Sequence, residues 1–269
     1  MWLPIGCTRS PLRPERPSGE RPEARLAELK RASQPLVARY RRIDECHPAS
    51  RSFTRLAAAS VERIVINILH ELDLAARERG ARLDLRGKGL DDVPEEIGLL
   101  DGVAEIDLSG NSLRNLPWSF SLLRQLKVLD LSGNKLTWLP DEVCGLTELV
   151  NLMMRWNAIK EISPAISGLI HLEKLELGSN KLEQLRSEVF DLTALRWLDV
   201  SENRLKSLHP NVGRLRELKY LEVYSNPFTL LPDEVWTLPK LEWINLDEDQ
   251  WERAPEAVRK RGKPALRIV

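Results

Sequence analysis

The chain has 269 residues, 30% of which are charged, and its 40 Lys and Arg balance its 40 Asp and Glu. A general binder of nucleic acid or of anionic membranes carries a basic excess, so this balance argues against both classes. No apolar run is long enough to span a bilayer, and the N-terminus lacks the basic and apolar regions of a signal peptide.

The cysteines are few and widely spaced, at Cys7, Cys46 and Cys144, and the chain contains no Asn-x-Ser/Thr sequon. Secreted domains of modest size commonly rely on disulfides, whereas proteins of a reducing compartment do not. The sequence therefore predicts a cytoplasmic protein.

Residues 1–22 are rich in proline and arginine, and we expect a disordered tail because they cannot bury enough apolar surface to order themselves. Residues 23–79 are predicted to be a helical region. Its second helix, from Thr54 to Arg79, carries an apolar stripe at three- and four-residue spacing. This stripe is predicted to cap the first end of the structure that follows, the alternative being a docking helix for a partner.

Residues 80–258 repeat themselves with a period of 23. Asparagines mark the period at Asn111, Asn134, Asn157, Asn180, Asn203 and Asn226. Self-similarity at a fixed period predicts stacked units that share a core. In one unit, Leu129 and Leu131 alternate on one face of a short strand, and Asn134 follows where the chain turns. The pattern predicts about eight parallel strands, with Asn134, Asn157 and Asn180 in one buried ladder.

The units depart from the pattern at three places. The first has Lys88 where the others have asparagine, which suits a terminal unit. The fourth reads Met153-Met154-Arg155-Trp156 after its strand leucine, and the eighth has lost its asparagine. Residues 259–269 are predicted to form a polar C-terminal tail.

The pattern L-x-x-L-x-L-x-x-N-x-L resembles the leucine-rich repeat superfamily. The second half of the unit, as in Leu116-Pro117, Leu139-Pro140 and Leu231-Pro232, resembles the Ras-group intracellular members, such as Ras suppressor protein and the plant Ras-group-related proteins. This resemblance implies an α/β solenoid with a curved parallel sheet and short helical turns on its convex side. It also implies a scaffold that binds a signalling protein on its concave face. We expect a monomer whose partner is a small GTPase or a kinase pathway component. The resemblance covers the repeats only.

Residues of catalytic type are scattered along the chain. The four histidines have no neighbours at ligand spacing, and no phosphate loop, nucleophile elbow or zinc motif occurs. Cys144 lies on a convex turn without a base nearby, so we expect it to fill space. The sequence therefore predicts a protein that is not an enzyme and holds no metal or cofactor.

The residues that alternate with the core leucines should face outward from the strands. An acidic row in the middle of this face is common in leucine-rich repeats, whereas an in-register aromatic ladder is not fixed by the family. Exposed aromatic side chains beside acidic ones are typical of interfaces. The candidate partner-binding residues are Trp197, Tyr220, Trp243, Tyr224, Glu176, Asp199, Glu222, Met153 and Arg155.

Two further expectations concern tryptophan. The C-terminal cap could fold over the aromatic ladder, which is the alternative to binding. Trp118, Trp138 and Trp236 are expected to pack between the convex turns.

The leading hypothesis for function is a protein-protein interaction scaffold or adaptor in intracellular signalling. One alternative is a regulator or injected effector whose first 79 residues carry a separate activity. Another is a fragment of a larger receptor.

Overall fold

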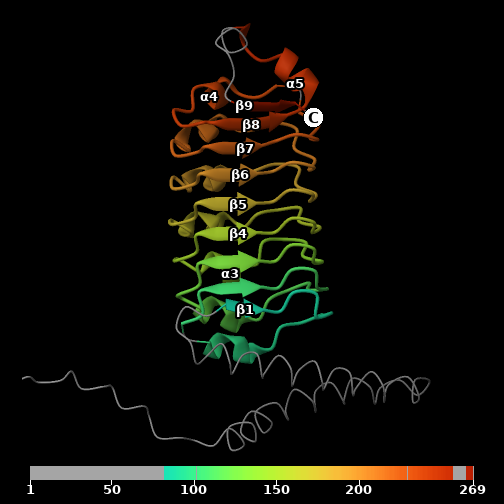
Figure 1. Cartoon of the computed structure of the whole chain (residues 1–269), viewed down its shortest axis with the longest axis vertical. Coiled ribbons are helices and arrows are strands. Elements are labelled where there is room, and N and C mark those ends of the chain that lie inside the picture. The colour runs from blue at the N-terminus through green and yellow to red at the C-terminus, as the bar shows by residue number, and fades with distance from the viewer. Residues whose placement is uncertain (1–81, 101, 229, 257–264, 269) are drawn as a thin grey trace, which may run out of the picture. The chain divides into compact units, whose positions relative to one another are not determined.

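The computed structural model describes residues 82–100, 102–228, 230–256 and 265–268 (Figure 1). The predicted tail, residues 1–22, and the predicted helical region with its capping helix, residues 23–79, lie outside the described residues. What the structure describes is the repeat region and one segment near the C-terminus.

One parallel sheet runs through this region in sequence order. The eight predicted strands are confirmed and are followed by a ninth: β1 (Arg82–Asp84), β2 (Glu105–Asp107), β3 (Val128–Asp130), β4 (Asn151–Met153), β5 (Lys174–Glu176), β6 (Trp197–Asp199), β7 (Tyr220–Glu222), β8 (Trp243–Leu246) and β9 (Ala265–Ile268). From β1 to β8 each residue pairs with the residue 23 positions further along, as Leu129 pairs with Leu152. Equivalent side chains of successive repeats therefore lie side by side.

Strand β9 was not predicted, because it falls in the segment expected to be a tail. Ala265 pairs with Trp243 and Arg267 pairs with Asn245, so β9 extends the sheet in the same parallel sense. It carries no asparagine, but Leu266 and Ile268 alternate as the core residues of the other strands do, and they pair with Ile244 and Leu246.

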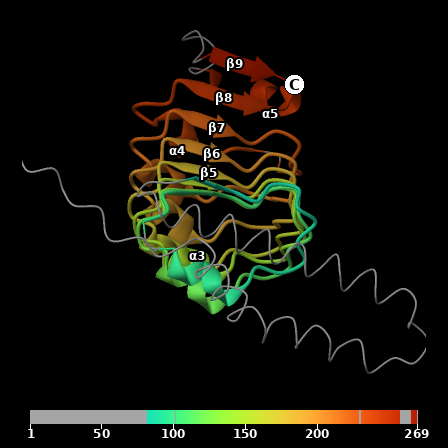
Figure 2. The ribbon, with the colours of Figure 1, turned by 60° about the horizontal axis from the view of Figure 1, so that its bottom comes forward.

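Each turn of the repeat region also carries a short helix on the side opposite its strand (Figure 2). These helices are η1 (Glu95–Leu99), η2 (Trp118–Leu122), α3 (Asp141–Cys144), η3 (Pro164–Gly168), η4 (Ser187–Asp191), η5 (Pro210–Arg214) and α4 (Asp233–Trp236), and α5 (Glu248–Glu252) follows β8. Proline sits at or directly before the first position of six of them, at Pro94, Pro117, Pro140, Pro164, Pro210 and Pro232. Proline fits there because the first helical N–H has no partner within the helix.

The core lies between the strand layer and the helix layer. In the third repeat, Leu129 and Leu131 from the strand side meet Leu136, Val143 and Leu146 from the return path, and all five are completely buried. Because every repeat contributes the same set of positions, the apolar core continues from one repeat to the next.

The predicted asparagine ladder is confirmed and contains six members, of which five are buried and Asn157 is half-buried. Asn134 accepts a hydrogen bond at Oδ1 from the Leu113 N–H, 3.0 Å away, and donates through Nδ2 to the carbonyls of Leu108 and Leu131. The other five repeat these bonds: Asn111, Asn157, Asn180, Asn203 and Asn226. Each side chain thus bridges its own turn to the preceding repeat.

The residue before each ladder asparagine has a left-handed backbone, and so has the residue before Lys88, which holds the asparagine position in the first repeat. In the first three repeats this residue is glycine, at Gly87, Gly110 and Gly133. In the next four it is Trp156, Ser179, Glu202 and Ser225, with φ between 52° and 55°. A side chain at such a φ costs roughly 1–2 kcal/mol, so these four turns store backbone strain that the first three avoid.

Replacing Gly133 by alanine should lower the free energy of unfolding by about 1 kcal/mol, because alanine would be held at φ 66°. A matched control is Gly145→Ala, since Gly145 has φ −77° and space for a Cβ. Urea titration of both variants would measure the difference. Equal losses would show that backbone conformation does not set the cost.

The expectation for the outer tryptophans is wrong for two of them. Trp118 is 65% exposed and Trp138 is 51% exposed. The positions equivalent to Trp138 in other repeats, such as Asn115, Glu161 and Gln184, are also exposed, so this position points away from the core in every turn. Trp236 is half-buried, and its ring meets that of Trp251 at 6.5 Å.

Candidate functional site

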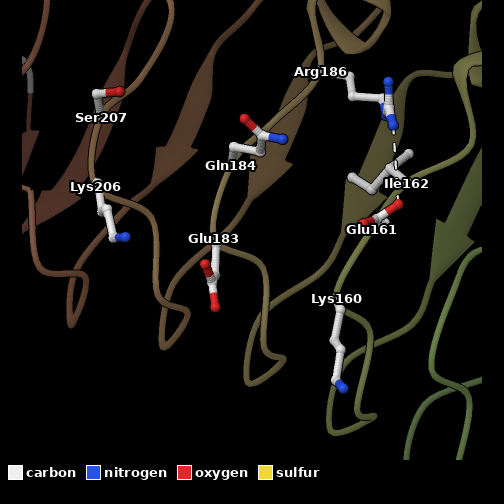
Figure 3. Close-up of a pocket in the computed structure, with 8 residues that line it drawn as sticks. All are labelled: Lys160, Glu161, Ile162, Glu183, Gln184, Arg186, Lys206 and Ser207. Carbon is white, nitrogen blue, oxygen red and sulfur yellow. Dashed lines mark ion pairs between the residues drawn. The ribbon is translucent and has the colours of Figure 1, made fainter.

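One groove lies on the flank of the repeats, along the segments that follow β4, β5 and β6 (Figure 3). It encloses about 540 Å³, and its lining includes Lys160, Glu161, Glu183, Arg186 and Lys206. Arg186 and Glu161 approach to 3.9 Å, and both are well exposed. The charges are mixed and mostly solvated, so this groove has no converging set of groups that would select a ligand.

The outward face of the sheet, opposite the short helices, is called here the concave face. The strands β2 to β5 and β7 each bury their middle residue and leave the first and third partly exposed. The register places Lys174, Trp197, Tyr220 and Trp243 on four neighbouring strands. The predicted aromatic ladder is therefore brought together on β6, β7 and β8.

The rings of Trp197 and Tyr220 stack, with centroids 4.8 Å apart and planes inclined by 29°. On the other side of Trp197, the Lys174 ammonium lies 5.2 Å from the indole centroid and 2.9 Å from Glu176 Oε1. Trp243 occupies the next register position after Tyr220. All three aromatic side chains remain partly exposed, so the described C-terminal residues do not cover them fully.

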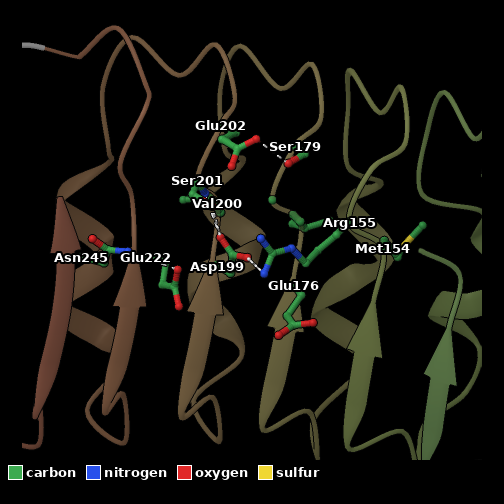
Figure 4. A network of polar contacts seen from close by, with 12 residues as sticks. Met154, Arg155, Glu176, Ser179, Asp199, Val200, Ser201, Glu202, Glu222 and Asn245 are labelled. Carbon is green, nitrogen blue, oxygen red and sulfur yellow. Dashed lines mark hydrogen bonds and ion pairs between the residues drawn. The ribbon is translucent and has the colours of Figure 1, made fainter. Parts of the chain in front are cut away.

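Asp199 holds the predicted register position between Glu176 and Glu222, but its environment differs from the prediction. It is completely buried, whereas we expected an exposed carboxylate on the concave face. Its Oδ1 accepts hydrogen bonds from the Ser201 N–H and hydroxyl, and its Oδ2 lies 3.2 Å from Arg155 Nη1 (Figure 4). Gly178 makes this possible, because a Cβ there would lie 2.7 Å from Oδ2.

Arg155 thus reaches from the end of β4 across β5 to a carboxylate on β6. Burial raises the pKa of the Asp199 carboxyl above its usual range, although the Ser201 hydrogen bonds and Arg155 oppose this shift. Burial and the neighbouring Asp199 charge also raise the pKa of Glu222. In the middle of the concave face, burial therefore disfavours the ionised forms of the Asp199 and Glu222 carboxylates.

The other acidic residues of the row serve the backbone. Asp84, Asp107 and Asp130 each accept a hydrogen bond at Oδ1 from the N–H two residues further on, at 2.8–3.1 Å. This bond braces the turn after the strand, which explains aspartate at the position. Glu176 and Glu222 make no such bond: the Glu176 carboxylate pairs with Lys174, and Glu222 Oε2 accepts a 3.5 Å hydrogen bond from Asn245 Nδ2.

Buried polar atoms without a hydrogen bond gather on this part of the face. They are Arg155 Nε, Trp197 Nε1, Asp199 Oδ2 and Asn245 Oδ1. Asp199 Oδ2 is close to Arg155 but is not aligned for a hydrogen bond. Such atoms cost free energy and are few in native proteins, so their clustering distinguishes this surface from the rest of the described repeats.

Two residues of this surface were missed by sequence reasoning. Trp156 is 60% exposed, its ring lies 4.9 Å from the Arg155 guanidinium carbon, and it occupies the left-handed position that is glycine in earlier repeats. That substitution for glycine was a visible signal. Glu202 accepts hydrogen bonds from the Ser179 and Tyr224 hydroxyls, and it gave no comparable signal. Met153 is half-buried between Asp130 and Glu176 in register, as predicted.

The described residues show no grouping suited to catalysis. Cys144 is buried and free, and burial raises its pKa to about 12, so its thiol stays protonated. No group of three or more His, Cys, Asp or Glu side chains in the described ranges is placed to hold a metal ion. Nor does any helix within those ranges have the length and apolar character needed to cross a membrane.

The family model for the leucine-rich repeat matches the chain at residues 81–136, 101–159, 147–205, 170–228 and 193–250. These matches together cover the described repeats almost completely. No curated protein matches the chain at the level that would mark a relative.

Several solved structures share the fold. A leucine-rich-repeat protein of Leptospira interrogans is 30% identical over 70% of this chain and 54% of its own, with a TM-score of 0.57. The ectodomain of the Arabidopsis thaliana receptor kinase GASSHO1/SCHENGEN3, in complex with CASPARIAN STRIP INTEGRITY FACTOR 2, is 28% identical over 66% of this chain and 22% of its own, with a TM-score of 0.56. An internalin of Listeria monocytogenes, 22% identical with a TM-score of 0.52, shares the fold alone.

The chain spans about half of the Leptospira protein and a smaller share of the Arabidopsis ectodomain. The matched repeats, their 23-residue register and the asparagine ladder agree with one another. The chain belongs to the leucine-rich repeat family.

Proposed function

We propose that this chain is a protein-interaction scaffold without catalytic activity, and that its concave face from β5 to β8 binds a partner protein. The observation that carries the proposal is the stack of Lys174, Trp197 and Tyr220, which stays partly exposed on a rigid sheet. Aromatic side chains held in this way are typical of the residues that dominate binding energy. The Arabidopsis ectodomain, which has this fold, is in complex with CASPARIAN STRIP INTEGRITY FACTOR 2.

A cytoplasmic, monomeric signalling adaptor is the finer form of this proposal. Its support is the resemblance of the repeats to the Ras-group type, the few cysteines of the chain and the free thiol of Cys144. A small GTPase or a kinase pathway component would be the partner under that resemblance.

The test is affinity capture with the full chain, comparing the wild type with a Trp197→Ala/Trp243→Ala variant. We expect the specific partner to bind at least about 30-fold more weakly, the equivalent of about 2 kcal/mol. A Trp118→Ala/Trp138→Ala variant is the matched control, because it removes two exposed tryptophans that are not on the concave face. Circular dichroism melts must show that both variants remain folded. Equal capture by the wild type and the Trp197→Ala/Trp243→Ala variant would contradict the proposal.

We also extend the proposed face to Trp156 in the turn after β4, because its exposed ring sits on a strained backbone and lies against Arg155, which reaches Asp199. We expect Trp156→Gly and Trp156→Ala to weaken partner binding equally. Only the glycine variant relieves the left-handed backbone, so it should be more stable than the alanine variant by about 1 kcal/mol. Binding by either variant at wild-type strength would place Trp156 outside the face.

A further inference from the structure

The concave face carries an excess of negative charge over β5 to β8. The excess is formed by a set called here the acidic strip: Glu176, Asp199, Glu202, Glu222 and Asp247. Two cationic side chains, Arg155 and Lys174, oppose it. Elsewhere on the same repeats acidic and basic side chains are matched, as in Arg196 with Glu173, Lys219 with Glu242 and Lys240 with Glu217. The imbalance therefore belongs to this face.

Both cationic side chains that lie against the acidic strip already form an ion pair with one of its carboxylates. Arg155 lies against Asp199, and the Lys174 ammonium is 2.9 Å from Glu176. Glu222 makes no ion pair within the part of the chain that the structure describes, and its nearest bond is a 3.5 Å contact from Asn245 Nδ2. A half-buried carboxylate beside a buried one is unfavourable unless a cation neutralises it.

The chain itself shows how a cation lies on this face. Lys174 on β5 sits between the Glu176 carboxylate of its own strand and the Trp197 ring of the next strand, 5.2 Å from the ring centroid. Two strands further along, Glu222 on β7 and Trp243 on β8 hold the equivalent register positions. The position of Lys174 is taken there by Tyr220, which carries no positive charge. The carboxylate and the indole ring therefore recur at β7 and β8, whereas the cation that lies between them at β5 and β6 has no counterpart there.

Resting on the proposed function, we propose that the partner presents a basic segment to this face, and that one of its arginine or lysine side chains lies between the Glu222 carboxylate and the Trp243 ring. A cation over an aromatic face and beside a carboxylate gains from both contacts. The remaining carboxylates of the acidic strip attract the segment over longer range and speed its association.

The test begins by selecting binders of the full chain from a phage-displayed random dodecapeptide library, with competition by the Trp197→Ala/Trp243→Ala variant. We expect the selected peptides to be enriched in arginine or lysine at one aligned position. Calorimetry with a synthetic selected peptide should then show at least about tenfold weaker binding by Glu222→Gln, which keeps the shape of the side chain. Glu105→Gln, which removes one carboxylate from the same face on β2, should change Kd less than about twofold.

Replacing the aligned arginine of the peptide by citrulline, its neutral isostere, should weaken binding to the wild type about tenfold. It should weaken binding to Glu222→Gln by a smaller factor, because there only the contact of the cation with the Trp243 ring is lost. Arg267 on β9 is paired in register with Asn245, the residue next to Glu222, so the variant Arg267→Gln tests whether the chain's own arginine neutralises Glu222. A tenfold gain in peptide affinity in that variant would mean that the chain already neutralises Glu222, and the inference would be overturned.

The outcomes separate this inference from the function on which it rests. Peptides that compete for the face but carry no basic position, or that bind Glu222→Gln as well as the wild type, overturn the inference alone. If no peptide is selected, the proposed function and the inference both fail. Self-association of the full chain that Glu222→Gln abolishes would assign the strip to a second copy and also overturn the inference.

Discussion

Replacing Asn180 by leucine is expected to lower the free energy of unfolding by about 3 kcal/mol, because several backbone groups lose their partner at once. Asn180 is buried and accepts a 3.0 Å hydrogen bond from the Ile159 N–H. It also donates to the carbonyls of Met154, Leu177 and Gly178. Leucine has the same branched arrangement of side-chain heavy atoms, but its methyl groups can satisfy none of these groups. Urea denaturation followed by circular dichroism measures the loss.

Two matched variants show whether the ladder is responsible. Asn157 makes the same bonds but is half-buried, so water can replace part of what is lost, and Asn157→Leu should cost about 1–3 kcal/mol. Asn115 is exposed and outside the ladder, so Asn115→Leu should change stability by less than about 0.5 kcal/mol. If Asn180→Leu lowers the free energy of unfolding no more than Asn115→Leu does, the ladder does not contribute to stability.

The ladder and the strand register could be predicted from the sequence because each repeat follows the same local rules. Asn134 bonds its own turn and the preceding repeat, so one unit and its period define the whole series. Strand β9 was not predicted in this way, because Ala265–Ile268 keeps only the alternating apolar pair of the unit, Leu266 and Ile268, and lacks its asparagine. Its pairing with β8 also departs from the period, since Ala265 follows Trp243 by 22 residues (265 − 243) and not by 23.

The candidate face was predicted less well than the fold. The aromatic positions follow from register alone, and Trp197 and Tyr220 do stack. The burial of Asp199 depends on the missing side chain of Gly178 and on the reach of Arg155 from a strand two positions away. Such a contact joins side chains of three different repeats, so a comparison of one repeat with the next does not reveal it. Charge reversal at Asp199 would therefore test folding and not partner association.

The Arg155–Asp199 pair leads to the second large effect. Replacing Arg155 by methionine should lower the free energy of unfolding by about 3 kcal/mol at pH 7, because it leaves a fully buried carboxylate without its cation. Arg186→Met is the control, since Arg186 and Glu161 form a long and exposed pair whose loss should cost less than about 0.5 kcal/mol. Thermal and urea denaturation at pH 7 compare the two variants.

The dependence on pH identifies the cause. Burial already raises the pKa of Asp199 in the folded protein, and removal of Arg155 should raise it further. As the pH falls through that raised pKa, the folded variant takes up a proton that the unfolded chain, with its lower pKa, does not yet bind. The loss of stability caused by Arg155→Met is therefore largest at neutral pH and becomes smaller as the pH falls.

The double variant Arg155→Met/Asp199→Asn should recover most of the lost stability at pH 7, because asparagine is uncharged and still accepts the Ser201 hydrogen bonds at its Oδ1. A loss that stays constant between neutral and acid pH, or a double variant no more stable than Arg155→Met, would mean that Arg155 stabilises the face by packing and not by neutralising Asp199.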